Sequence, residues 1–182
     1  MGQYYIAIIL HENKDNEPES IMAYLEAFFD SGMKLTEHSY LANPFVNTFE
    51  YQLTKEGMFY KTRVVWAGDY ADNEKDSEMN LYKLTGKYPK KSLNSLNIPV
   101  RVTNDFHYIV NHSKKQYTDK RKQKLYHPLP LLTAEGNGRG GGDFKGKGEN
   151  LIGIWARDVI SVETEIPDNY NELICEFEEM SE

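Results

Sequence analysis

The residues most able to do chemistry lie in a glycine-rich stretch from 136 to 148. Seven of the 13 glycines fall in this stretch, and residues 136–141 read G-x-G-x-x-G. In dinucleotide-binding proteins that motif joins a strand directly to a helix. Here the run Gly-Asp-Phe-Lys-Gly follows at 142–146, and a run of this kind does not begin a helix. The motif therefore does not predict a dinucleotide site.

Three basic residues, Arg139, Lys145 and Lys147, lie within the same glycine-rich loop. Backbone amides of glycines can form a concave nest that binds an anion, and these side chains would add positive charge. A phosphate-loop motif would need Ser or Thr after the lysine, but Gly148 follows Lys147. The loop is a candidate anion-binding site. The alternative is a connection whose glycines serve only to allow positive φ angles.

No residue pattern indicates a catalytic or metal site. The histidines lack ligand spacing, and His107 and His112 would point to opposite faces of one strand. The single Cys175 excludes an internal disulfide and a cysteine-based zinc site. Neighbouring glutamates would raise the pKa of its thiol and weaken it as a nucleophile. We expect no cofactor, no metal and no enzymatic activity, although a small enzyme with an unfamiliar site stays an alternative.

Charge is distributed unevenly along a chain whose net charge is −7. Residues 158–182 hold nine acidic residues and neither Lys nor Arg. The acidic segment 168–182 could bind a basic protein surface, and its candidate contacts are Glu172, Glu176, Glu178 and Glu179. The alternative interpretation is a solvated helix face.

A basic run occupies residues 114–124 and includes Lys120 and Arg121. Together with Tyr117 and Tyr126 it could neutralise and stack on a nucleic acid. The plainer interpretation is a solvated hairpin edge, where lysines prevent pairing with another chain. Both basic groups, in the loop and in this run, are candidates for anion or nucleic-acid binding.

Apolar patterns predict the elements that would position these residues. The expected strands are 4–10, 59–67, 106–111 with a hairpin partner through 117, and 151–162. The expected helices are 16–31, 43–57, 72–84 and 170–177, although residues 172–178 also alternate as a strand would. Residues 86–99 are expected to form a loop. Strands in hairpin-like pairs, with helices clustered early, favour an α+β fold with a mainly antiparallel sheet and a few packed helices. We predict a single compact domain over residues 1–182.

Composition agrees with a globular protein. Aromatic residues make up 13% of the 182 residues, which argues against disorder because aromatic side chains supply burial. No apolar run approaches the roughly 18–20 residues of a membrane span. The first residues lack the basic start and the cleavage site of a signal peptide. We expect a cytoplasmic protein that does not bind a membrane, and the sequence does not predict its oligomeric state.

The opening residues MGQYY and five later blocks resemble a group of small proteins of bacteria, phages and plasmids that begin in the same way. The blocks are 35–47, 63–72, 108–117, 127–146 and 155–167, in the same order as in that group. Thr36 departs from the longer apolar residue expected there, and segments 11–30 and 73–104 diverge. The resemblance spans nearly the whole chain and defines a family better than a function.

In size and style the chain also resembles the phage-encoded anti-CRISPR proteins that inhibit type II-A Cas9. This resemblance implies a non-enzymatic inhibitor that binds Cas9, or Cas9 with its guide RNA, and hinders DNA binding or cleavage. Cas9 holds nucleic acid in basic channels, and the four glutamates could occupy one of them. The alternative is a nucleotide- or nucleic-acid-binding module that uses the glycine-rich loop and the basic hairpin.

Overall fold

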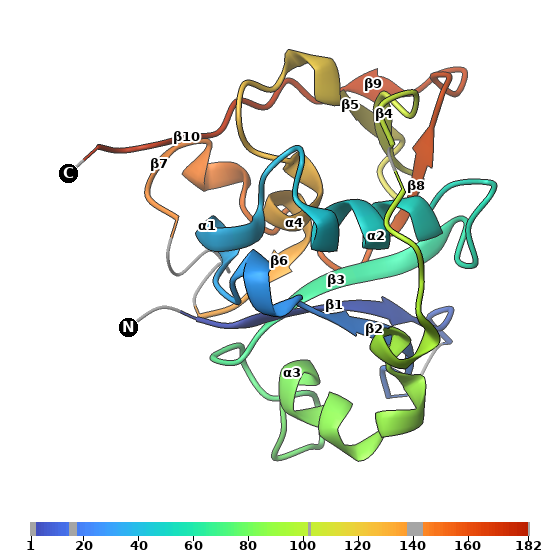
Figure 1. Ribbon diagram of the computed structural model, residues 1–182, viewed down its shortest axis with the longest axis vertical. Coiled ribbons are helices and arrows are strands. Elements are labelled where there is room, and N and C mark those ends of the chain that lie inside the picture. Colours follow the sequence, from blue (N-terminus) through green and yellow to red (C-terminus); the bar gives the residue numbers. More distant parts are fainter. Residues whose placement is uncertain (1–2, 15–17, 102, 138–143, 182) are drawn as a thin grey trace.

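The computed structural model describes residues 3–14, 18–101, 103–137 and 144–181, and its fold is α+β (Figure 1). One mostly antiparallel sheet has the strand order β2-β1-β3-β8-β4-β5-β9, and β6 pairs with β3. Its strands are β1 (Tyr5–Leu10), β2 (Ile21–Glu26), β3 (Thr62–Gly68), β4 (Tyr108–Asn111), β5 (Gln116–Asp119), β6 (Ala134–Glu135), β8 (Val159–Glu163) and β9 (Asn171–Glu172). A second small sheet pairs β7 (Gly146–Lys147) with β10 (Glu178–Glu179). The fold class predicted from the sequence is confirmed.

The helices are short. The α-helices are α1 (Leu35–His38), α2 (Pro44–Gln52), α3 (Leu81–Leu84) and α4 (Pro128–Thr133). The 3-10 helices are η1 (Phe29–Ser31), η2 (Thr85–Lys87), η3 (Pro89–Lys91), η4 (Leu93–Leu96), η5 (Lys120–Lys122) and η6 (Glu149–Leu151). None of the helices in the described ranges is long and apolar enough to cross a membrane.

Strands β1 to β3 are covered on both faces. A larger apolar cluster joins one face to α2 and α4, where the rings of Phe45 and Phe49 lie 5.4 and 5.2 Å from that of Trp66. A smaller cluster joins the other face to α3, where Ile8 and Leu81 are buried. Figure 1 shows α3 on the opposite side of these strands from α1, α2 and α4. Because both faces are buried, strands in this part of the sheet are mostly apolar instead of alternating.

Several predicted elements are confirmed. The strand predicted at 4–10 is β1, which begins at Tyr5, and the hairpin predicted from 106 to 117 is β4 and β5. The helix predicted at 43–57 is α2, which ends earlier, at Gln52. Its N-cap is Asn43, whose side-chain oxygen accepts from the backbone N–H groups of Phe45 and Val46 at 2.9 and 3.2 Å. Pro44 opens the first turn, where its missing N–H costs nothing.

The helix predicted at 16–31 is wrong, because residues 21–26 form strand β2. Ala23 and Leu25 enter the larger cluster, while Ile21 and Tyr24 enter the smaller one. A strand buried on both faces has apolar residues at nearly every position, so some of them fall at helical spacing by coincidence.

Three other predicted elements are corrected. The helix predicted at 72–84 is limited to α3, because the Asn80 side chain donates to the carbonyls of Asp69 and Ala71 and holds the preceding residues in turns. The strand predicted at 151–162 begins only at Val159, after a turn in which Arg157 has a φ of 70°. The helix predicted at 170–177 is an extended segment, described below.

Candidate interaction surface

The acidic C-terminal segment, residues 168–181, runs in extended form along the edge of the main sheet and on to β7 (Figure 1). Strand β9 pairs in parallel with β5, and Leu173 N–H donates to the carbonyl of Tyr117 at 2.7 Å. Strand β10 pairs antiparallel with β7, and Met180 N–H donates to the carbonyl of Lys145 at 2.9 Å. The backbone of the segment is therefore held at both ends.

Two inward side chains anchor the middle of this segment. Cys175 and Phe177 are each 5% exposed and belong to the larger apolar cluster. The ring of Phe177 meets that of Phe144 edge to face at 6.0 Å. Burial raises the pKa of the Cys175 thiol, whose sulfur lies 3.1 Å from the hydroxyl of Thr118. Cys175 therefore packs as a neutral side chain.

The segment's glutamates meet the basic residues of the same chain. Glu172 pairs with Lys122, and Glu176 pairs with Lys147 and, at 3.5 Å, with Lys124. The hydrogen bond to Lys147 lowers the pKa of Glu176. Tyr126 donates its hydroxyl to Glu179 at 2.7 Å. The acidic segment and the basic run, which the sequence presented as two separate surfaces, therefore lie against each other.

The outward side of the segment combines apolar and acidic side chains. Ile174 is 70% exposed and Met180 is 71% exposed, and Glu178 between them is also exposed. The Glu176 side chain, which shares this side, is 40% exposed. We call these four residues, 174, 176, 178 and 180, the C-terminal strip. Exposed apolar surface rimmed by polar groups marks protein-binding sites, and Ile174 and Met180 are the most exposed large apolar side chains among the described residues.

The predicted anion-binding residues that lie within the described structure are each paired with a carboxylate. Lys145 lies 3.5 Å from Glu149, and Lys147 pairs with Glu176. Arg121 pairs with Asp119 at 2.9 Å, and the Lys120 side chain is only 11% exposed. Arg139 lies outside the described residues.

Lys120 belongs to a buried charge cluster that the sequence did not predict. Its ammonium lies 2.6 Å from Glu50, whose side chain is fully buried on α2. The other carboxylate oxygen of Glu50 faces Nε2 of His127, while Nδ1 of that ring accepts from the Leu129 N–H at the start of α4. Burial disfavours the charge on Glu50, but His127 and Lys120 outweigh it and lower the pKa of Glu50 to about 2. The cluster joins α2, α4 and the residues after β5.

A chain of polar side chains crosses β8 and the end of β4. Ser161 donates to Glu163 at 2.6 Å and lies 2.7 Å from Nε2 of His112, whose Nδ1 lies 2.9 Å from the Tyr170 hydroxyl. Burial, and then Lys61, lower the pKa of His112. A hydrolase triad needs its carboxylate on the second histidine nitrogen and an accessible serine. Here the carboxylate contacts the serine, which is fully buried. The spacing of Ser161 and Glu163 on one strand was the only signal in the sequence.

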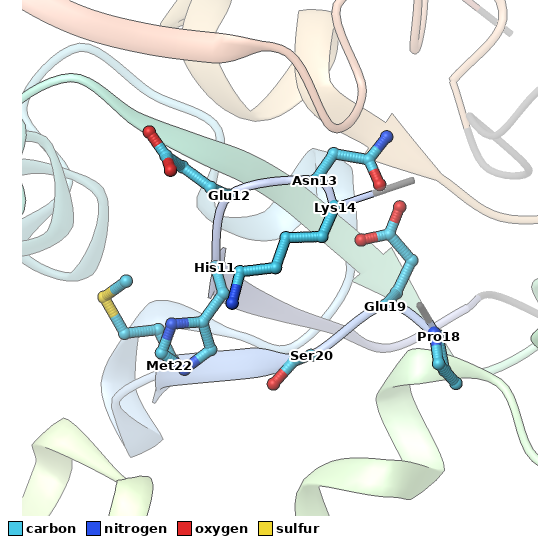
Figure 2. Close-up of a pocket in the computed structure, with 8 residues that line it drawn as sticks. All are labelled: His11, Glu12, Asn13, Lys14, Pro18, Glu19, Ser20 and Met22. Carbon is cyan, nitrogen blue, oxygen red and sulfur yellow. The ribbon is translucent and has the colours of Figure 1, made fainter. Parts of the chain in front are cut away.

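Two pockets near the β1–β2 loop hold ion-paired side chains. One of about 510 Å³ is shown in Figure 2, where the Lys14 side chain extends toward His11. One of its two carboxylates, Glu19, is bound by Arg63 at 2.6 and 2.8 Å, which lowers the pKa of Glu19. A cleft of about 780 Å³ beside it holds Arg157, which donates to two glutamates. Among the described residues no group of three His, Cys, Asp or Glu could hold a metal ion.

Comparison of the chain with protein-family models, with curated proteins and with solved structures gives no match.

Proposed function

We propose that the protein is a non-enzymatic inhibitor carried by a phage or other mobile element. It binds a bacterial immune nuclease, Cas9 alone or with its guide RNA, in the cytoplasm of the host and hinders DNA binding or cleavage. The observation that supports this proposal is the C-terminal strip, where exposed Ile174 and Met180 flank exposed carboxylates. A strip of this kind suits a basic protein groove with an apolar wall.

The way the strip is held also supports binding. Its backbone is ordered by β9 and β10, and Phe177 fastens it to the core. A partner would therefore meet a segment that has already lost most of its conformational entropy, which lowers the cost of association. Within the described residues the Glu178 side chain makes no hydrogen bond or ion pair, although it lies opposite Lys147 on β7, so its exposed carboxylate is available to a partner.

The direct test is a pull-down and a DNA-cleavage assay with several type II-A Cas9 orthologues, with and without guide RNA. We expect stoichiometric inhibition of at least one orthologue and weaker binding at higher salt. The proposal fails if all the purified nucleases ignore a large excess of the protein. It also fails if the protein turns over a small molecule in substoichiometric amounts.

Charge reversal on the strip tests the interface itself. Neutralising Glu172, Glu176 and Glu179 would also remove contacts inside the chain, so Glu178→Lys is the cleaner change. We expect it to weaken nuclease binding by about tenfold or more, because a like charge then faces the basic partner. Glu78→Lys is the matched control, since Glu78 is exposed on the loop before α3 and gives the same change in net charge. Equal inhibition by the two variants would remove the strip from the mechanism.

A further inference from the structure

Strands β4, β5 and β8 pack one face against the larger apolar cluster, and their opposite face carries a surface distinct from the C-terminal strip. Val110 lies opposite Ser161 on β8 and opposite Tyr117 on β5, and Tyr108 lies two residues before it. Residues that are opposite one another, or two apart on a strand, share a face of the sheet. Val110 is fully buried and yet belongs to neither apolar cluster. In the described structure, Val110 is therefore covered by neighbouring side chains of the same face, and neither apolar cluster includes it.

Those covering side chains are mainly tyrosines. The rings of Tyr108 and Tyr117 meet edge to face at 5.8 Å, and the ring of Tyr170 meets that of His112 at 5.6 Å. Tyr60 donates its hydroxyl to the carboxylate at the end of β8 at 2.7 Å. All four tyrosines are partly exposed to solvent. We call Tyr60, Tyr108, Tyr117 and Tyr170 the tyrosine face.

Along the border of the tyrosine face, the positively charged side chains are exposed to solvent. Two ion pairs lie along it, and in each one the cation is more exposed than the carboxylate. The exposed fractions are 55% against 10% for Arg121 and Asp119, and 55% against 25% for Lys122 and Glu172. The exposed ammonium of Lys61 lies 5.5 Å from the centre of the Tyr60 ring. Arg121 also lies over the Tyr108 ring, at 5.5 Å from its centre. A ligand approaching the tyrosines therefore meets guanidinium and ammonium groups first.

We propose that the tyrosine face binds single-stranded nucleic acid. Unpaired bases stack on aromatic rings, while Arg and Lys beside the rings neutralise the phosphates. In a duplex the bases are already stacked on each other, so their faces cannot reach the rings. Exposed ion pairs contribute little to stability, so a phosphate can replace a carboxylate at Arg121 or Lys122 without a large cost. This surface is separate from the C-terminal strip, and its binding does not depend on the inhibitor proposal.

The test is fluorescence anisotropy with labelled oligo-dT and oligo-U of about 20 nucleotides, against a duplex of the same length. Titrations are run from about 50 to 200 mM salt. The charge variant replaces Arg121, Lys122 and Lys61 by Gln. The control variant replaces three exposed lysines near α3 by Gln: Lys75, Lys83 and Lys87. We expect only the charge variant to reduce the slope of log affinity against log salt, by about 2, since each lost phosphate contact contributes about 0.7.

The rings are tested by Tyr117→Ala and Tyr117→Phe, after circular dichroism has shown that each variant is folded. Removing the ring should weaken single-strand binding by roughly 5- to 100-fold, while Phe should bind within about twofold of the original protein. If Tyr117→Ala does not fold, Tyr170→Leu, on the loop before β9, takes its place with Tyr170→Phe as its control.

Four outcomes would overturn the proposal. They are no binding to either oligonucleotide at the lowest salt, equal or tighter binding to the duplex, equal losses in the charge and control variants, and unchanged binding after ring removal. A face that binds only a protein partner would give the first of these outcomes.

Discussion

The buried cluster around Glu50 makes the sharpest prediction about stability. Lys120→Met keeps the length of the side chain and removes its charge. In the unsubstituted protein, the ammonium of Lys120 lies 2.6 Å from Glu50 and also donates to the carbonyl of Thr103 at 3.2 Å. After the substitution, the fully buried carboxylate of Glu50 would keep only His127 as a partner.

The expected cost follows from this geometry. Removing one partner of a buried ion pair typically lowers the free energy of unfolding by about 3–5 kcal/mol, because the other charge stays buried. His127 stays beside Glu50 as a second partner, so we expect the lower end, about 3 kcal/mol. A whole domain is stable by only about 5–15 kcal/mol, so the loss would be large. With a urea dependence of about 2 kcal/mol per molar, the midpoint of unfolding would fall by about 1.5 M.

The same substitution should change the response to acid. The pKa of Glu50 is about 2 in the folded protein and 4.5 ordinarily. Because the folded value is lower, the carboxylate stabilises the protein fully above pH 4.5, and this stability is lost as the pH falls toward 2. Removing Lys120 raises the folded pKa of Glu50, so less stability remains to be lost in this window.

The measurement is urea unfolding followed by the fluorescence of the buried Trp66 and Trp155. Arg121→Met is the matched control, since it removes the same charge one residue along the chain. The Arg121 side chain is 55% exposed, so loss of its pair with Asp119 should cost much less than loss of the buried Lys120. Equal losses in the two variants, or a loss below about 1 kcal/mol for Lys120→Met, would refute the reasoning.

Three further predictions concern stability. The pKa of the buried His38 is lowered from 6.5 to about 4, mainly by burial. Stability should therefore fall by about 3 kcal/mol as the pH drops from 6.5 to 4, where protonation breaks the hydrogen bond from Trp66; unfolding midpoints that stay flat across this range would contradict it. Asn43→Ala should lower the free energy of unfolding by about 1 kcal/mol through loss of the α2 cap, while Asn43→Asp should change it little, and calorimetry would separate the two. Phe177→Ala should cost about 3–5 kcal/mol by leaving a cavity beside Phe144, and a loss near zero in urea unfolding would mean that the C-terminal segment is not anchored there.

The sequence alone was sufficient to predict the elements that depend only on neighbouring residues. Asn43 and Pro44 identify the start of α2, because a capping side chain and a preset φ angle act on neighbouring residues alone. The apolar run of β1 and the hairpin of β4 and β5 were found for the same reason. The fold class follows from the order of such elements.

Elements that depend on contacts between residues far apart in the sequence were determined only by the tertiary structure. Ile21 and Leu25 have helical spacing, but burial between two cores makes them part of a strand. Ile174 was expected on the apolar face of a terminal helix, yet it is exposed because pairing with β5 and β7 keeps the segment extended.

The ion pairs likewise could not be predicted from the sequence and were determined by the tertiary structure. The sequence contains an acidic segment and a basic run, but it cannot tell that Lys122 and Glu172, 50 positions apart, neutralise each other. It also cannot separate Lys120, which is buried against Glu50, from the exposed Arg121 beside it. An ion pair forms wherever the fold brings two charges together, and that distance is a property of the packed chain and not of any local stretch of it.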